Sequence, residues 1–566
     1  MPLRDRRLAG LGMLAFIIAG AAPPPDRPLD PALDTITSEG ILKHVKILAS
    51  DEFEGRGPGT PGEEKTVDYL IGQLRAIGLE PGNPDGTFVQ KVPLIGFQAT
   101  RVQASFSAGT QSIPLDFPRN FVAVPGRAGE EPRLDDSQVV FVGYGAVASE
   151  YDWDDFKGVD VRGKTLLMLV GDPPVPDPKD PSKLDPALFK GRAMTYYGRW
   201  TYKYEIAAKR GAAAAILVHE DGPAGYPFSV VQGSWSGENF DIAAAPGTRG
   251  EPQVAVKGWI DTPTAVRLCQ ACGLDLANLK KAAIRRDFHP LPTTARISAQ
   301  IDVKSRTVVS RNVIARLPGS DPALRGQHVI YTAHWDHLGR DPKLQGDQIY
   351  NGAADNASGV AAVLEIARAL AKVEPRPKRS FLFLFVTAEE KGLLGSKYYA
   401  TNPLYPLEGT LADINLDVIN LWGKTSDLIS IGMGQSTLDD LLVEAASARG
   451  RAVGPDAEPE KGYYYRSDHF EFAKQGVPAL DPKGGRHCLD KPTDYAQRMQ
   501  DAYTEKNYHK VSDEVRPDWD LSGAVEDLKL ILEVGYRVAM ADTFPRWKPD
   551  SEFRARREAA MKAALP

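Results

Sequence analysis

The sequence predicts an α/β protein built on a doubly wound mixed sheet, with a second, mainly β body inserted into it. Three observations predict this class. Apolar runs typical of buried strands alternate with helical patterns from about residue 306 to 536. A series of short apolar strands lies upstream, at about 113–301. Finally, 566 residues exceed what one ordinary core can use, so two or three domains are expected.

The N-terminus has the features of a secretory signal peptide, which we expect at residues 1–22. Basic residues precede an apolar run at 8–18, and the small residues 19–21 then offer a cleavage site. The run is too short to span a membrane comfortably, which favours cleavage over an N-terminal anchor. No Cys follows the run, so lipid attachment there is excluded. We expect an exported protein, periplasmic or extracellular, with no stable membrane insertion after cleavage.

Composition and charge exclude several classes. The formal net charge of −6 and the absence of a basic arm argue against a nucleic-acid binder. Three cysteines are too few for a disulfide scaffold. Cys269 and Cys272 lie near the end of an expected helix, which favours a local disulfide or two packed thiols over a redox site. The one glycosylation sequon, Asn356-Ala357-Ser358, lies among the acidic motifs described below, where a glycan could not fit. The sequence thus offers no usable glycosylation site, which favours a bacterial exported protein.

Two blocks precede the alternating segment. Residues 35–112 have apolar side chains at helical spacing, among them Ile41, Val45 and Leu48, and are expected to form the N-terminal part of the main domain. The block 113–301 contains short strands and one helix that leads into a strand, and we expect it to be an inserted domain outside the chemistry.

Residues 302–566 are expected to form the main part of the large domain. Strands are predicted at 328–333, 380–386, 412–418, 428–431 and 477–480. Helices are predicted at 358–372, 436–448 and 520–540. In a doubly wound sheet the site lies beyond the carboxyl ends of the strands. Side chains suited to chemistry follow the predicted strands at His334, Glu389, Glu390 and Asp417, so a site is expected at this edge.

The residue types indicate a hydrolase with two metal ions, most simply zinc. Two zinc ions that share one carboxylate need roughly five protein ligands drawn from His, Asp and Glu. The chain offers His334, Asp355, Asp417, Glu390 and His509. Of two adjacent carboxylates after a buried strand, one can bind metal while its neighbour acts as a general base. Glu389 is the carboxylate left for that role.

Four motifs stand out: His334-Trp335-Asp336, Asp355-Asn356-Ala357-Ser358-Gly359, Ala388-Glu389-Glu390-Lys391-Gly392 and Asn415-Leu416-Asp417. Together they closely resemble the co-catalytic zinc aminopeptidases, relatives of glutamate carboxypeptidase and the transferrin receptor. The resemblance covers the third block and the N-terminal helical block. The middle block looks like the protease-associated domain that several members of the family carry. The family fold and activity imply peptide substrates and two zinc ions per chain.

The resemblance also implies a role for each site residue. One zinc ion would be held by His334, Asp355 and Asp417. The other would be held by Asp355, Glu390 and His509, with Asp355 bridging. Further matches give Glu389 as the general base, Asp336 as the carboxylate that orients the His334 imidazole, and Tyr508 as the group that polarises the scissile carbonyl.

Other interpretations stay open at this point. A carboxypeptidase or dipeptidase on the same scaffold would need an Arg or Lys pocket for a free carboxylate, and the sequence does not reveal one. A non-catalytic binding protein is the alternative from a different class. His337 is expected in a loop or at a helix end rather than as a ligand, and His469 as a packing residue. The preferred side chain and the oligomeric state are not predicted.

Overall fold

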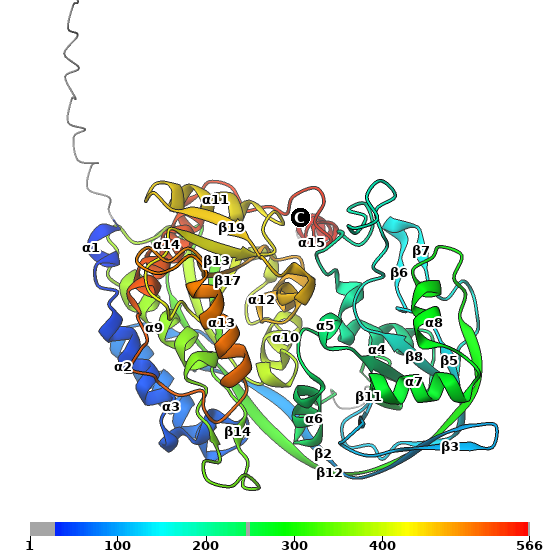
Figure 1. Cartoon of the computed structure of the whole chain (residues 1–566). Coiled ribbons are helices and arrows are strands. Elements are labelled where there is room, and N and C mark those ends of the chain that lie inside the picture. Colours follow the sequence, from blue (N-terminus) through cyan, green and yellow to red (C-terminus); the bar gives the residue numbers. More distant parts are fainter. Residues whose placement is uncertain (1–28, 245–249, 564–566) are drawn as a thin grey trace, which may run out of the picture.

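The computed structural model describes residues 29–244 and 250–563, so the signal peptide expected at 1–22 lies outside the described residues. The chain forms two bodies joined by a long two-stranded ribbon (Figure 1). The ribbon consists of β2 (Val89–Ala108) and β12 (Leu291–Leu317), which pair antiparallel from Val89 to Ala108. One end of β12 pairs with β16 of the first body and the other with β5 of the second, so the sheet is continuous through both.

The first body contains a mixed sheet in the order β19-β18-β20-β17-β13-β16-β12. Its strands are β13 (His328–His334), β16 (Ser380–Val386), β17 (Thr410–Asn415), β18 (Asp427–Ile431), β19 (Ala452–Pro455) and β20 (Ala479–Gly484). β16, β13, β17 and β20 run parallel, and β12 is antiparallel to β16. β18 is antiparallel to β20 but parallel to β19. Every residue of β13, β16 and β17 is buried, as expected for strands covered on both faces. The predicted α/β class with a mixed sheet is confirmed.

Helices cover both faces of this sheet. One face packs against α2 (Ser38–Leu48), α3 (Pro61–Ile77), α9 (Gly359–Leu370), α11 (Thr437–Ser447) and α14 (Ser522–Met540). The other face packs against α10 (Leu394–Thr401) and α12 (His469–Lys474). Local sequence fixes the ends of several helices. The Ser436 side chain caps the first turn of α11, and Gly78 ends α3 with φ +87°, a conformation that favours glycine.

The second body has its own sheet and its own core. The strands β5 (Arg133–Phe141), β8 (Thr165–Leu169), β9 (Ala214–His219), β11 (Val256–Asp261) and β4 (Phe121–Pro125) follow one another in that order. Separate hydrophobic clusters pack on its two faces. The covering helices are α4 (Trp200–Lys209), α6 (Phe228–Ser236), α7 (Thr262–Ala271) and α8 (Leu276–Ala283). The body is therefore mixed α/β in content, and its identity as a protease-associated domain stays a prediction. Cys269 and Cys272 are free thiols, so no disulfide joins them.

Shorter elements complete the described chain. The helices are α1 (Asp30–Leu33), α5 (Asp221–Ala224), α13 (Tyr495–Lys506) and α15 (Arg554–Ala563). The short strands are β1 (Glu80–Pro81), β3 (Gln111–Leu115), β6 (Val147–Ala148), β7 (Trp153–Asp154), β10 (Asn239–Ile242), β14 (Gly339–Arg340) and β15 (Ile349–Tyr350). Among the residues described, no helix is both long and apolar enough to cross a membrane.

The two bodies also touch away from the ribbon. The Tyr196 ring of the second body lies 5.9 Å from the Tyr465 ring and 5.2 Å from the Phe470 ring of the first. The Met194 backbone N–H donates to the Pro459 carbonyl at 3.0 Å. The second body is thus fixed against the first by side-chain packing as well as by the ribbon.

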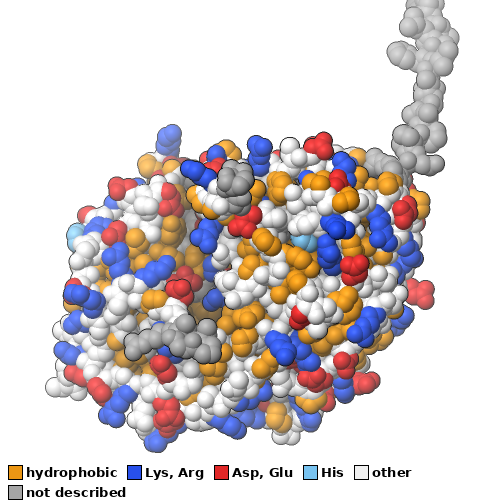
Figure 2. Space-filling model, turned by 180° about the vertical axis from the view of Figure 1, so that it is seen from behind, with side chains coloured by type: hydrophobic (Ala, Val, Ile, Leu, Met, Phe, Trp, Pro, Cys, Tyr) orange, Lys and Arg blue, Asp and Glu red, His pale blue; other side chains and the backbone are white. Residues whose placement is uncertain are grey.

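The face in Figure 2 carries basic and acidic side chains interspersed, without a broad area of one sign.

Candidate metal centre

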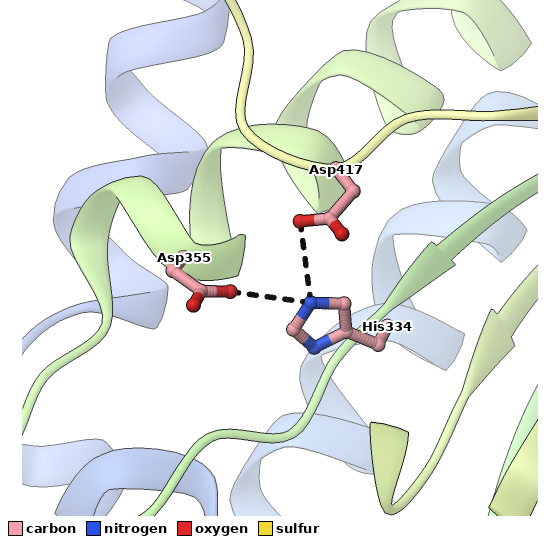
Figure 3. A group of neighbouring side chains, drawn as sticks. All are labelled: His334, Asp355 and Asp417. Atoms are coloured by element: carbon pink, nitrogen blue, oxygen red, sulfur yellow. Dashed lines mark ion pairs between the residues drawn. The ribbon is translucent and has the colours of Figure 1, made fainter. Parts of the chain in front are cut away.

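His334 lies at the carboxyl end of β13 and is 1% exposed. Its Nε2 is 3.2 Å from Asp355 Oδ1 and 3.5 Å from Asp417 Oδ1 (Figure 3). Asp355 comes from the segment that leads into α9, and Asp417 follows β17. Because β13 and β17 are parallel neighbours, their carboxyl ends bring these side chains together at one edge of the sheet.

The second oxygen of Asp355 faces a second group of ligands. His509 Nε2 lies 3.3 Å from Asp355 Oδ2 and 2.9 Å from Glu390 Oε2. His337 Nδ1 lies 2.6 Å from the other Glu390 oxygen, Oε1. Asp355 therefore offers one oxygen to each side, as a bridging ligand does.

The donor set fits divalent metal ions. Three groups of described residues bring His and carboxylate ligand atoms within 4.8 Å of one another: His334 with Asp355 and Asp417, His334 with Glu389 and Glu390, and His337 with Asp355 and Glu390. His509 Nε2 is buried and has no hydrogen-bond partner, although two carboxylates face it. Imidazole nitrogen and carboxylate oxygen are the ligands of zinc in co-catalytic sites. Two ligand groups that share Asp355 thus fit a pair of ions.

The charges of these side chains also favour the binding of cations. Burial would lower the pKa of His509, but Glu390 and Asp355 outweigh it and raise that pKa to about 10. Burial likewise opposes charging of His334, yet Glu389 and the surrounding carboxylates hold its pKa well above the ordinary range. The excess negative charge of the pocket stabilises any positive group within it, which is the condition for binding divalent metal.

Glu389 lies beside the ligands without joining the His334–Asp355–Asp417 group. Its Oε2 is 3.9 Å from His334 Nε2. Burial, with the nearby carboxylates of Glu390 and Asp468, raises the pKa of Glu389 well above its usual range, against the opposing effect of His334. A carboxylate with a raised pKa takes up a proton readily, as a general base requires.

Asp336 occupies the expected place but makes a different contact. The Nδ1 of His334 faces the backbone carbonyl oxygen of Asp336 at 3.2 Å, while the carboxylate Oδ1 is 3.9 Å away. That oxygen accepts the backbone N–H of Glu389 at 3.1 Å. The Asp336 carboxylate thus fixes the backbone of Glu389, the expected base, and its carbonyl oxygen faces the His334 imidazole.

Further polar residues fix the backbone and carboxylates of the centre. The Ser467 hydroxyl donates to Asp417 Oδ2 at 2.7 Å, and Lys483 donates to the Asp417 carbonyl oxygen. Asp513 accepts the backbone N–H groups of Ala354 at 3.0 Å and Asp355 at 3.1 Å. These contacts immobilise the two aspartates of the His334 group.

Arg56 ties three loops together beneath the centre. Its guanidinium is 1% exposed and donates to the carbonyl oxygens of Trp335 at 2.9 Å, Asn351 at 2.6 Å and Gly352 at 2.8 Å. Burial lowers its pKa to about 10, although nearby carboxylates, Asp513 first, oppose the shift. Arg56 comes from the N-terminal block, which explains why that block belongs to the same body as the site.

Tyr508 lies beside His509, whereas His469 is packed in the interior. The Tyr508 ring stacks on the His509 ring with centroids 3.9 Å apart, and its phenol interacts with Arg466. His469 is buried and packs edge-on against Tyr464. The His487 imidazole contacts Asp427 at 2.9 Å and is 64% exposed.

Sequence reasoning did not find three residues at the centre. His337 is fully buried against Glu390, and only its place directly after His334-Trp335-Asp336 could have indicated it. Arg466 precedes the Ser467-Asp468-His469 motif, but its contact with Tyr508 has no local signal. Arg199 belongs to the second body, and nothing in its surrounding sequence predicts its place near Tyr508.

Comparisons with known proteins agree with this geometry. A sequence model described as Peptidase family M28 matches residues 312–532, the segment that carries every metal-centre residue named in the ligand groups. The Probable lipoprotein aminopeptidase LpqL of Mycobacterium tuberculosis is 24% identical over 509 residues, 84% of this chain and 80% of that protein. Leupeptin-inactivating enzyme 1 of Streptomyces exfoliatus is 31% identical over 175 residues, 30% of this chain and 34% of that protein.

One solved structure extends the likeness to nearly the whole chain. The aminopeptidase from Aneurinibacillus sp. strain AM-1 aligns with a TM-score of 0.51 at 20% identity, and the match covers 89% of this chain and 95% of that one. At this identity the match shows the fold. Fold and site together define an α/β metallohydrolase. Residues 312–532 match peptidase family M28, and together with the relatives this match supports a zinc-dependent metallopeptidase, which confirms the resemblance to the co-catalytic zinc aminopeptidases.

Proposed function

We propose that the protein is an exported di-zinc aminopeptidase that removes N-terminal residues from peptides. The observation that carries the proposal is the shared Asp355, whose two oxygens face His334 on one side and His509 on the other. The names of the relatives support an aminopeptidase activity. A relative of Pyrenophora teres named Probable zinc metalloprotease, 37% identical over 108 residues, supports zinc.

In this proposal each site residue has a stated task. One ion would be held by His334, Asp355 and Asp417. The other would be held by Asp355, Glu390 and His509, with His337 fixing the second oxygen of Glu390. When bound, the two ions would supply Lewis acidity and lower the pKa of a water molecule.

The chain's own groups then move the proton and orient the substrate. Glu389 accepts the proton of the attacking water and delivers it to the leaving amine. Asp336 keeps Glu389 in place through the backbone N–H of that residue. The Tyr508 phenol lies at the edge of the centre, next to the His509 ring, where it can donate to the oxygen of the scissile carbonyl as charge develops there.

Export is supported by the signal-peptide pattern at residues 1–22 and by the envelope location that the mycobacterial relative's name implies for that protein. The proposal therefore places the mature protein in the periplasm or outside the cell.

A dipeptidase or carboxypeptidase is the second candidate, and one observation favours it. Arg199 and Arg466 lie near Tyr508, whereas the sequence alone had shown no basic pocket for a free carboxylate. The acidic metal centre still suits the ammonium group of a free N-terminus, which keeps the aminopeptidase as the first choice.

Two measurements test the proposed function. Metal analysis of dialysed protein should give two zinc ions per chain, and one ion or none would contradict the di-zinc site. An unblocked peptide such as Leu-Gly-Gly should be cleaved, and its N-acetylated form should not, because the blocked amine can no longer pair with the carboxylates. Equal cleavage of both, with loss on C-terminal amidation, would favour the carboxypeptidase instead.

A further inference from the structure

A strand of the inserted segment lies against the turn that carries the expected general base. In the sequence, β10 (Asn239–Ile242) comes between α6 and β11 of the second body. It nevertheless pairs antiparallel with β2 of the ribbon, where Phe240 is the partner of Gly96. β10 also contacts the Glu389–Lys391 turn and α10, the helix that follows this turn. The inserted segment therefore touches the part of the first body from which Glu389 extends.

Phe240 is the apolar residue through which β10 packs at this turn. Its side chain is 7% exposed and belongs to one hydrophobic cluster with Ala388, Leu394 and apolar residues of the ribbon. Ala388 directly precedes Glu389, and Leu394 is the first residue of α10. The cluster therefore joins Phe240 to the residues on both sides of the turn.

The ribbon holds the Phe240 ring closely. A Cβ atom placed on Gly96 would lie 3.0 Å from Cε1 of the ring and 2.7 Å from Glu238 Oε1. The Arg306 guanidinium of β12 lies 5.7 Å from the ring centroid. The same guanidinium donates to both carboxylate oxygens of Glu238, at 2.6 and 2.8 Å. The ring is therefore fixed by close contact with the ribbon backbone and by the Arg306–Glu238 ion pair.

The turn depends on its surroundings because its backbone is strained. Ala388 has φ +53°, a left-handed conformation that residues with a Cβ atom rarely adopt. Such a conformation persists where the surrounding contacts hold it. The backbone N–H of Thr387 donates to Asn312 Oδ1 at 3.1 Å, and that of Glu389 donates to Asp336 Oδ1 at 3.1 Å. Between these two anchored residues, Ala388 is fully buried in the cluster that contains Phe240.

We propose that Phe240 is a positioning residue for catalysis, which packs with Ala388 and so holds Glu389 in the orientation that accepts the proton. The inference rests on the proposed function, because that function makes Glu389 the general base. A base must lie within hydrogen-bond reach of the proton that it takes, so a small displacement lowers the rate of the chemical step. The inserted segment thus contributes to this step although the three ligand groups lie in the first body.

Steady-state kinetics of the zinc-loaded protein with Leu-Gly-Gly test this role. Phe240→Ala should lower kcat about ten- to a hundredfold, since a displacement of about 1 Å can cost a hundredfold in rate. KM and the zinc content should stay at the wild-type values, because the substitution removes no group that binds peptide or metal. Phe240→Leu keeps an apolar side chain in the cluster, so its kcat should lie closer to that of the wild type than to that of Phe240→Ala.

Phe288→Ala is the matched control. Phe288 is also 7% exposed, but it lies in the core of the second body, where its ring centroid is 6.0 Å from that of Phe141. This substitution should lower the melting temperature, as Phe240→Ala does, but leave kcat at the wild-type value. An unchanged kcat in Phe240→Ala, or an equal fall of kcat in Phe288→Ala, would overturn the positioning role.

Hydrogen exchange separates this inference from the proposed function, because it needs no turnover. The backbone amides of residues 387–394 should exchange roughly tenfold faster in Phe240→Ala than in the wild type, and at the wild-type rate in Phe288→Ala. If no aminoacyl peptide is cleaved but this difference is found, the aminopeptidase proposal fails and the hold of Phe240 on the turn stands. If peptides are cleaved and Phe240→Ala changes neither kcat nor exchange, the reverse holds. A fall of kcat without faster exchange would also contradict the inference, because the ring would then act elsewhere.

Discussion

At the scale of single residues, the adjacent side chains of Glu389 and Glu390 face different groups. Glu390 faces His337 and His509 at 2.6 and 2.9 Å, whereas Glu389 faces the space beside His334. The side chains diverge because both residues lie in a short 3-10 turn, Glu389–Lys391, that follows β16. In the proposed function, contact with two imidazoles suits Glu390 to bind metal, and Glu389 is left to carry the proton.

Glu389→Ala should therefore remove nearly all turnover while the metal content stays at that of the wild type. A positioned general base contributes roughly a hundred- to ten-thousand-fold in rate. Metal analysis and kcat on the same preparation give the result. Glu390→Ala is the matched comparison and should lose zinc together with activity. If Glu389→Ala lost metal while Glu390→Ala kept it, the two roles would have to be exchanged.

At the scale of elements, α14 packs unusually closely on the central strand β13. A Cβ atom placed on Gly535 would lie 2.0 Å from the Tyr331 hydroxyl oxygen and 2.8 Å from Cζ of the same ring. That hydroxyl donates to the Ile531 carbonyl of α14 at 2.9 Å. The glycine is thus required by the buried tyrosine of the strand that ends in His334.

Gly535→Ala should destabilise the protein by about 1–3 kcal/mol, because the helix must move away from Tyr331 or the ring must shift. Gly72→Ala in α3 is the control, since no atom lies within 4 Å of a Cβ placed there. That change should instead stabilise the fold by about 0.5–1 kcal/mol, as alanine does in a helix interior. Urea unfolding measures both. Equal effects of the two substitutions would contradict the close packing.

At the scale of the whole molecule, buried neutral histidines make stability depend on pH. His328 is fully buried against Tyr405, and neither ring nitrogen has a hydrogen-bond partner. Burial lowers its pKa from 6.5 to about 3. The unfolded chain binds a proton below about pH 6.5, whereas the folded one does not until about pH 3. Stability is thus full above pH 6.5 and is lost as the pH falls toward 3.

When the pH is lowered from 8 to 5, the buried His328 should reduce the free energy of unfolding by about 2 kcal/mol. His328→Phe keeps a ring against Tyr405 and should lessen the loss by that amount. His289→Phe is the control, because His289 is exposed, and it should leave the pH dependence as in the wild type. The free energy of unfolding in urea at the two pH values decides the matter. An unchanged slope in His328→Phe would show that this residue is protonated in the folded state.

The second body is expected to shape substrate binding without building the metal centre. All His, Asp and Glu residues of the three ligand groups come from the first body. Gln98 and Lys304 are antiparallel partners in the ribbon, so an Asn-Gly turn can replace residues 99–303. The shortened protein should bind as much zinc as the wild type and show a raised KM for peptides. A soluble, folded protein without zinc would show that the second body helps to form the centre.

Much of the fold could be predicted because it follows from local patterns. The strand predicted at 380–386 coincides with β16, and the helices predicted at 436–448 and 520–540 differ from α11 and α14 by one or two residues. The strand predicted at 412–418 was too long. β17 ends at Asn415, since the apolar residues Leu416 and Val418 belong to a turn in which Val418 has φ +55°.

By itself, the sequence determined the fold class, the sheet edge that carries the chemistry and the types of ligand gathered there. Those features depend on apolar periodicity and on side chains at strand ends, which are local properties of the chain. Only the tertiary structure decided that His337 meets Glu390, that Arg56 joins the N-terminal block to the centre, and that Tyr196 of the second body packs on Phe470 of the first. These contacts join residues far apart along the chain, and the packing of one body or loop against another creates them. No local pattern encodes that packing, because it depends on the shapes of surfaces that form only when both parts are folded.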